Sequence, residues 1–101
     1  MRMMMTASFP LEPFNTMVRN GSAGSTLKKI LADLKPEAAW FVENDGKRTG
    51  VFIVEVPDQS RIPSFAEPFF LLFNAECRFR IAMTPDDLGR AGLDELGRKW
   101  K

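Results

Sequence analysis

The alternation of apolar and polar positions is clearest in the stretch from Pro36 to Val56, and the rest of the chain can be arranged around it. Two apolar runs, at residues 38–42 and 51–56, flank a polar turn that contains Asp45-Gly46. Asp-Gly between two such runs is a strong local signal for a β-hairpin. We therefore predict that the two runs are neighbouring antiparallel strands.

The second run, residues 51–56, indicates where the hairpin lies in a sheet. Successive side chains of a strand point to opposite faces. Here the two sets are Phe52, Val54 and Val56 on one face and Val51, Ile53 and Glu55 on the other. Because both faces are largely apolar, we expect this strand in the middle of a sheet, with each face covered by other groups.

Helical periodicity lies on either side of the hairpin. Residues 11–34 predict helix with a break at residues 20–25, since the Gly- and Ser-rich sequence there is poor helix material. Residues 62–73 predict a second helix, in which Pro68 either causes a kink or moves the start toward Ala66. The apolar faces carry Leu27, Ile30, Leu31 and Leu34 in the first helix and Ile62, Phe65, Ala66, Phe69, Phe70 and Phe73 in the second.

The two ends of the chain complete the pattern. Residues 2–9 have the composition of a weak strand, and residues 76–83 alternate clearly, with an apolar and a basic face. Residues 84–101 predict a short C-terminal helix that begins at a Thr-Pro-Asp-Asp cap and is weakened by three glycines. One side of this tail carries Leu88, Leu96 and Trp100.

The resulting order, β-α-β-β-α-β plus a tail helix, predicts an α+β ferredoxin-like fold. We expect one domain over residues 1–101, with residues 84–101 as a helical tail. In this arrangement two helices cover one face of a four-stranded antiparallel sheet and leave the other face open.

The open face suggests two uses. Residues 49–56 superficially resemble the third-strand motif of RNA-recognition domains, but the two base-stacking positions hold Val51 and Ile53, and the net charge is only +1. We therefore expect no nucleic-acid binding. Aliphatic residues suit contact between two such sheets, so we predict a homodimer of the dimeric α/β barrel type.

Four segments resemble a small bacterial family whose members have about this length. They are residues 20–24 (NGSAG), 35–39 (KPEAA), 66–70 (AEPFF) and 83–88 (MTPDDL). The resemblance implies a ferredoxin-like, dimeric α/β barrel subunit, but the family is a domain of unknown function and implies no chemistry for these residues. Wider relatives of the fold include muconolactone isomerases, small monooxygenases and ligand-binding regulatory domains, so the fold alone selects no activity.

Composition narrows the chemistry. The 101 residues include no histidine, no tyrosine and a single cysteine, Cys77, so we expect no metal site and no cofactor. The N-terminal apolar run ends too early for a signal peptide, and no run is long enough for a membrane span. We expect a cytoplasmic protein without a membrane partner.

Three residues are candidates for ligand binding. Arg78 and Arg80 lie two apart on one strand, so both are expected on the open face, where a guanidinium pair could bind a carboxylate or phosphate. The alternative is that they pair with Glu43, Glu55 or Glu76 across strands or across the dimer. Trp40 could line the same pocket or could simply be packed.

Glu43 and Glu55, on the two arms of the hairpin, are the candidates for a catalytic base, because burial would raise the pKa of a carboxylate. Solvated strand ends are the commoner place for such residues, and no acid partner is evident. Cys77 is expected in the core, since the chain offers no histidine to activate it.

Together these patterns predict a protein that binds a small, anionic organic ligand in a cavity on the open sheet face of a homodimer. Two alternatives remain open: a cofactor-free isomerase or monooxygenase, and a module that binds another protein. The sequence leaves undetermined the ligand, the pathway, and whether a second subunit, the tail or another protein covers the open face.

Overall fold

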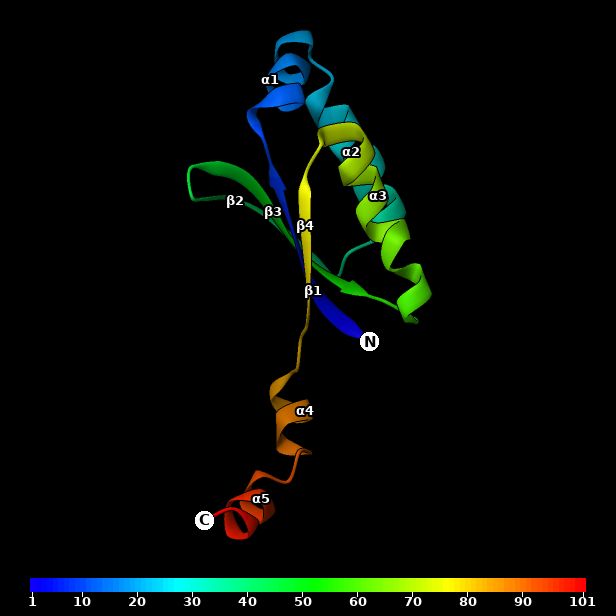
Figure 1. Cartoon of the computed structure of the whole chain (residues 1–101). Helices are drawn as coiled ribbons and strands as arrows, with labels where there is room; N and C mark the ends of the chain where they lie inside the picture. Colours follow the sequence, from blue (N-terminus) through cyan, green and yellow to red (C-terminus); the bar gives the residue numbers. More distant parts are fainter.

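The computed structural model describes residues 1–101 as an α+β fold built on a four-stranded antiparallel sheet with the strand order β2-β3-β1-β4 (Figure 1). The strands are β1 (Arg2–Phe9), β2 (Ala38–Asn44), β3 (Lys47–Glu55) and β4 (Glu76–Ile81). The helices are α1 (Leu11–Asn20), α2 (Ala23–Leu34), α3 (Ile62–Phe73), α4 (Pro85–Gly89) and α5 (Leu93–Lys99), and a single 3-10 turn, η1 (Gln59–Arg61), precedes α3. The sequence-based prediction that the doubly apolar strand lies inside the sheet is confirmed, since β3 lies between β2 and β1.

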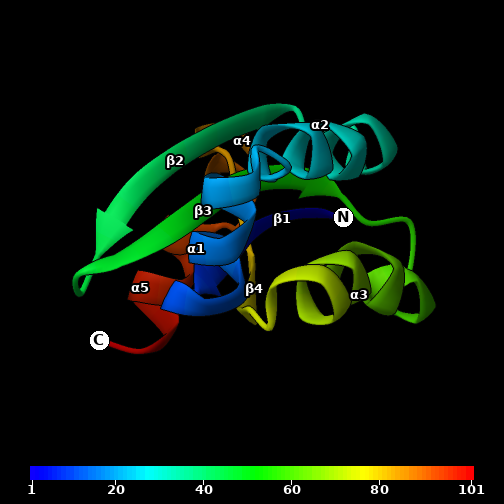
Figure 2. The ribbon, with the colours of Figure 1, turned by 90° about the horizontal axis from the view of Figure 1, so that it is seen from above.

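Helices α2 and α3 lie on the same face of the sheet, and α1 crosses one end of it (Figure 2). The core forms between this face and the helices. Its fully buried large side chains are Met5 and Phe9 of β1, Phe52 and Val54 of β3, Val56 just beyond β3, and Phe69 and Phe73 of α3. Burial of an aromatic side chain stabilises a fold by roughly 1.5–3 kcal/mol, so this cluster anchors the helices to the sheet.

The β2–β3 hairpin has the turn that its sequence predicts. Asp45 and Gly46 have positive φ angles of 53° and 75°, as in a type I′ turn. This two-residue loop lets the pairing continue into the polar residues beside it, where Glu43 lies opposite Arg48. Both strands of the hairpin therefore reach closer to the turn than the apolar runs alone predicted.

One prediction about α3 is confirmed and one is wrong. The helix begins at Ile62, as the predicted range 62–73 requires, because the Asp58-capped turn η1 and Pro63 in the first helical turn start it before Pro68. The alternative start near Ala66 does not occur, and the wrong prediction concerns Phe70. Phe70 is 40% exposed and does not belong to the buried face. Phe65, Phe69 and Phe73 follow one another at intervals of four and face the sheet, so Phe70 is turned about 100° away from them.

The C-terminal tail consists of two short helices instead of the single predicted one, because the chain breaks at Gly89–Gly92, where Gly92 has a φ of 74°. The tail points away from the sheet, along the direction of β4 (Figure 1). The molecule is therefore 60 Å long and 28 by 19 Å across, with a radius of gyration of 17.1 Å. A compact chain of 100 residues would have about 13 Å. No helix has the length and hydropathy needed to cross a bilayer.

Candidate ligand-binding site

The open face of the sheet has an apolar half and a cationic half. Cross-strand pairing places Trp40, Val51, Thr6 and Arg78 in one row and Ala38, Ile53, Met4 and Arg80 in the next. Since neighbouring strands are about 4.8 Å apart, the arginines lie roughly 10 Å from the valine and isoleucine of β3. As predicted, Arg78 and Arg80 share one face of β4, and the structure brings both onto the same surface as Trp40.

The two arginines differ in their partners. Arg78 Nη2 lies 3.7 Å from Glu76 Oε2 of the same strand, which is one of the structural pairings that the sequence allowed. Arg80 forms no ion pair. Trp40, in the apolar half, is 56% exposed. Within one chain none of the three residues lines a cavity, so their role as ligand residues stays a prediction.

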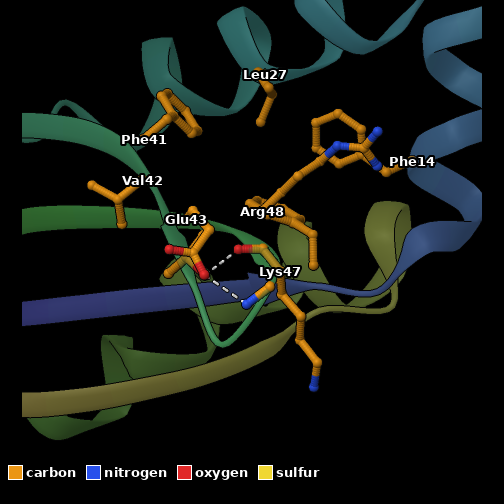
Figure 3. Close-up of a pocket in the computed structure, with 10 residues that line it drawn as sticks. Phe14, Leu27, Phe41, Val42, Glu43, Lys47 and Arg48 are labelled. Carbon is orange, nitrogen blue, oxygen red and sulfur yellow. Dashed lines mark hydrogen bonds between the residues drawn. The ribbon is translucent and has the colours of Figure 1, made fainter.

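A groove of about 530 Å³ lies on the opposite side of the sheet, between the β2–β3 hairpin and helices α1 and α2 (Figure 3). Its apolar walls come from Phe14 of α1, Leu27 of α2 and Phe41 of β2. Phe41 pairs with Gly50, and a side chain at position 50 would meet the ring of Phe52. The Phe52 ring occupies the space that a side chain at position 50 would need, and the Phe41 ring stands edge-on to it with ring centroids 5.9 Å apart.

The polar end of the groove is formed by Glu43 and Arg48. The guanidinium of Arg48 lies over the Phe14 ring, 4.4 Å from its centroid, and forms no ion pair. Glu43 is its cross-strand neighbour, but Glu43 Oε2 instead accepts a hydrogen bond of 2.7 Å from the Gly46 N–H. Lys47 points away from the groove (Figure 3). The groove therefore combines an aromatic wall with one cation whose N–H groups are available to a ligand.

The two predicted carboxylates lie on different faces of the sheet. Glu43 lines the groove, whereas Glu55 is on the open face, where it pairs with the N-terminal ammonium group. Both side chains are exposed, so neither has the burial on which the argument for a base depended. The structure does not bring the two carboxylates together.

Sequence reasoning missed most of the groove. It identified Glu43, but not Arg48, Phe14, Leu27 or Phe41 as ligand-facing residues. Arg48 could have been found, because it lies four positions before Phe52 and therefore on the same face of the strand. The groove is closed by α1 and α2, which pack against the hairpin. No pattern along the sequence indicates this packing.

Cys77 and the acidic residues offer no further site. Cys77 packs beside the core as expected, and burial raises the pKa of its thiol to about 11. This pKa disfavours the thiolate that a nucleophile or a metal ligand needs. No group of three or more Cys, Asp or Glu side chains is placed to hold a metal ion.

Comparison with known proteins does not identify the chain. No protein-family model matches it, and no curated protein is significantly similar to it. The resemblance to the small bacterial family therefore stays a prediction.

Proposed function

We propose that the protein binds a small organic anion with an apolar body, and that it does so as a homodimer of ferredoxin-like subunits. The observation that carries the ligand proposal is the groove beside the hairpin. Three apolar walls and an unpaired arginine meet there in a space of about 530 Å³. Ligand sites are commonly apolar clefts of about 300–1,000 Å³ with few, well-placed polar groups.

The chemistry of the groove indicates how the ligand would lie. An aliphatic or aromatic body would cover Leu27 and Phe41, and its carboxylate or phosphate would accept hydrogen bonds from Arg48. The guanidinium is held over Phe14, so it would lose less rotamer freedom on binding than a free side chain. Glu43 would favour a ligand that also carries a hydroxyl or amino group, because such a group can donate a hydrogen bond to a carboxylate oxygen.

Calorimetric titration with octanoate and with 1-naphthoate tests this proposal. A hydrogen bond to a charged group contributes about 1.5–3 kcal/mol, so Arg48→Met should weaken binding by roughly 10- to 100-fold. Arg61→Met, which removes an exposed arginine far from the groove, is the matched control and should leave the affinity unchanged. Octylamine should bind more weakly than octanoate.

The same titration distinguishes the groove from the open face, where the sequence predicts the ligand. If Arg80→Met abolished binding and Arg48→Met did not, the site would lie on the open face, between two copies. If neither anion stabilised or bound the protein at millimolar concentration, the ligand proposal would be wrong.

The homodimer rests on a separate observation. The strand order β2-β3-β1-β4 and the placement of the helices on one face are those expected of a ferredoxin-like subunit, and on the open face Trp40 is exposed beside Val51 and Ile53, which are only partly buried. A surface of this kind on a monomer would be unusual. Light scattering over a range of concentrations should give the mass of two chains, and the mass of one chain at all concentrations would contradict the dimer.

An enzymatic role is a second candidate, supported by the position of Glu43 on the groove. In that case the carboxylate would take a proton from a bound substrate, and no cofactor would be needed. Turnover of a ligand identified by titration should then vanish in Glu43→Gln and persist in Glu55→Gln, whose side chain lies on the other face. Equal turnover in both variants would exclude Glu43 as the base.

A further inference from the structure

We infer that the C-terminal tail of one copy covers the apolar half of the open sheet face of a second copy. This inference rests on the homodimer of the proposed function, but not on its ligand. It gives the open face one occupant, helix α5 of the partner, and it gives the tail the packing that it lacks within its own chain.

The tail needs a partner surface for its own stability. Helices α4 and α5 have 5 and 7 residues, and every residue from Leu88 to Lys101 is exposed. Isolated helices shorter than about 12–15 residues are marginal in water, and most helices in proteins depend on packing. A capping box at Thr84 and ion pairs within each helix support the tail locally, but they bury no apolar surface.

Helix α5 carries an apolar stripe that suits the sheet. Leu93, Leu96 and Trp100 follow one another at intervals of three and four, so they share one side of the helix. Their exposed fractions are 55%, 45% and 75%. A buried tryptophan removes roughly 150–250 Å² from water, whereas a standard interface buries about 800 Å² per partner. In the proposed dimer, the stripe of one copy faces Trp40 and the β-branched residues of β3 in the other copy. These two surfaces together provide much of the buried area that a stable dimer requires.

Charges on the two surfaces are complementary. Asp94 is in the first turn of α5 and has no ion pair, and Arg80 on the cationic half of the sheet has none either. If the stripe lies on the apolar half, a helix running across the strands can direct Asp94 toward the β4 side. The pair would satisfy both charges across the interface.

The path of the chain favours a second copy over the tail's own sheet. Ala82 still donates a backbone hydrogen bond to Arg2, so the strand direction continues past β4. Thr84 precedes a proline, which restricts it to extended conformations, and its angles are φ −78° and ψ 164°. With only three residues between β4 and α4, the tail leaves the sheet in line with the strand (Figure 1). When each of two copies places the same element on the other, the result is a domain-swapped dimer with two-fold symmetry, which is a common form of dimer.

Isotope-mixed cross-linking of the full chain tests this exchange. In a Cys77→Ser background, Ala38→Cys places a thiol on the open face and Gly97→Cys places one beside the stripe of α5. Labelled and unlabelled protein of this kind are mixed, unfolded together, refolded and treated with a short bismaleimide. We expect peptides that join position 38 of one isotope to position 97 of the other.

The other outcomes separate the two proposals. Linked peptides of one isotope only would mean that the tail folds back on its own sheet, which would overturn the inference. A dimer by light scattering without any such link would leave the homodimer intact and overturn the exchange. A monomer at all concentrations would overturn both.

The dimer affinity of variants with altered charged or apolar residues provides a second test. Trp100→Asp should weaken dimerisation about 30-fold or more, as expected for a central tryptophan. Leu71→Asp, on the outward side of α3 where it is 77% exposed, is the matched control and should leave the dimer unchanged. Arg80→Glu should weaken the dimer, and Asp94→Arg added to it should restore affinity. If Trp100→Asp and Leu71→Asp behaved alike, the stripe would not be in the interface.

Discussion

Both faces of the sheet carry apolar side chains, but the two faces differ in what surrounds these side chains. On one face, β1 and β3 present Met5, Phe9, Phe52 and Val54 to helices that bury them almost completely. On the other face, Val51 and Ile53 are only partly buried, and the exposed Arg78 and Arg80 lie two strands away. Helices of the same chain cover the first face, whereas the second face has no such cover within the chain.

This difference indicates which face contributes most to the stability of the folded chain. The covered face has six aromatic contacts centred on phenylalanines, with ring centroids between 5.1 and 6.0 Å apart. Such packing tolerates little change. The open face has no comparable packing and can be altered at lower cost, so variants on the two faces should separate folding from assembly.

Truncation at the centre of the covered face should have the largest effect. Phe69→Ala should lower the free energy of unfolding by about 3–5 kcal/mol, because it leaves a cavity among Phe9, Phe52 and their neighbours. Val51→Ala on the open face should cost about 1 kcal/mol or less at low protein concentration, since Val51 is only partly buried. Urea denaturation of the two variants measures both values, and equal losses would mean that the faces are equally packed.

Thiol chemistry should distinguish the faces by reaction rate. Cys77 is on the covered face, and burial raises its pKa from 9.0 to about 11. Near pH 8 the thiolate fraction should therefore be roughly 100-fold smaller than for an ordinary thiol, with alkylation slower by at least this factor. The neighbouring position on the open face supplies the control: Arg78→Cys in a Cys77→Ser background should react at the ordinary rate. Similar rates with iodoacetamide would contradict the covered position of Cys77.

Gly50→Ala should destabilise the hairpin side of the covered face. The added Cβ would lie 2.5 Å from the Phe52 ring, which is fully buried and cannot move freely. Overpacking of this kind costs about 1–3 kcal/mol. Thermal unfolding should show the loss. A variant of unchanged stability would mean that Phe52 can shift.

The smallest expected effect is the loss of stability of helix α4 in the tail when the pH is lowered. In the capping box of α4, Asp87 accepts a hydrogen bond from the Thr84 N–H, and the hydrogen bonds from Thr84 lower the Asp87 pKa below 3.8. Because the folded pKa is lower than the unfolded one, this contribution is present above pH 3.8 and is lost as the pH falls through the folded pKa. Chemical shifts of α4 followed from about pH 5 to pH 2 should report its loss while the sheet persists. In Thr84→Ala the helix should be weaker already at neutral pH, by about 1 kcal/mol.

The sequence predicted the elements and the two faces because both follow from local periodicity. The alternation from Val51 to Val56 placed β3 inside the sheet, and the spacing of Arg78 and Arg80 placed them on the open face. The predicted start of α3 at Ile62 is confirmed, because the cap at Asp58 and Pro63 in the first turn are local signals that start the helix ahead of Pro68.

The groove was beyond sequence reasoning for a different reason. It depends on how α1 and α2 approach the hairpin, and that distance is set by tertiary packing and not by any pattern along the chain. Arg48 in particular looks like an ordinary turn-flanking residue until Phe14 is placed beneath it. The extension of the tail away from the sheet was likewise hidden, since Leu96 and Trp100 predict an apolar helix face without naming its partner.

The strand order has a consequence for how the protein behaves at high concentration. It leaves β2 and β4 as the two edges of the sheet, each with a row of backbone groups that could pair with another chain. Strand β4 has arginines and a glutamate along it, which oppose the addition of a foreign strand. Strand β2 instead exposes Trp40, Phe41 and Val42 in succession, without charge or proline among them. We expect aggregation to begin at this edge, so a lysine at position 42 should improve solubility more than one added elsewhere on the surface.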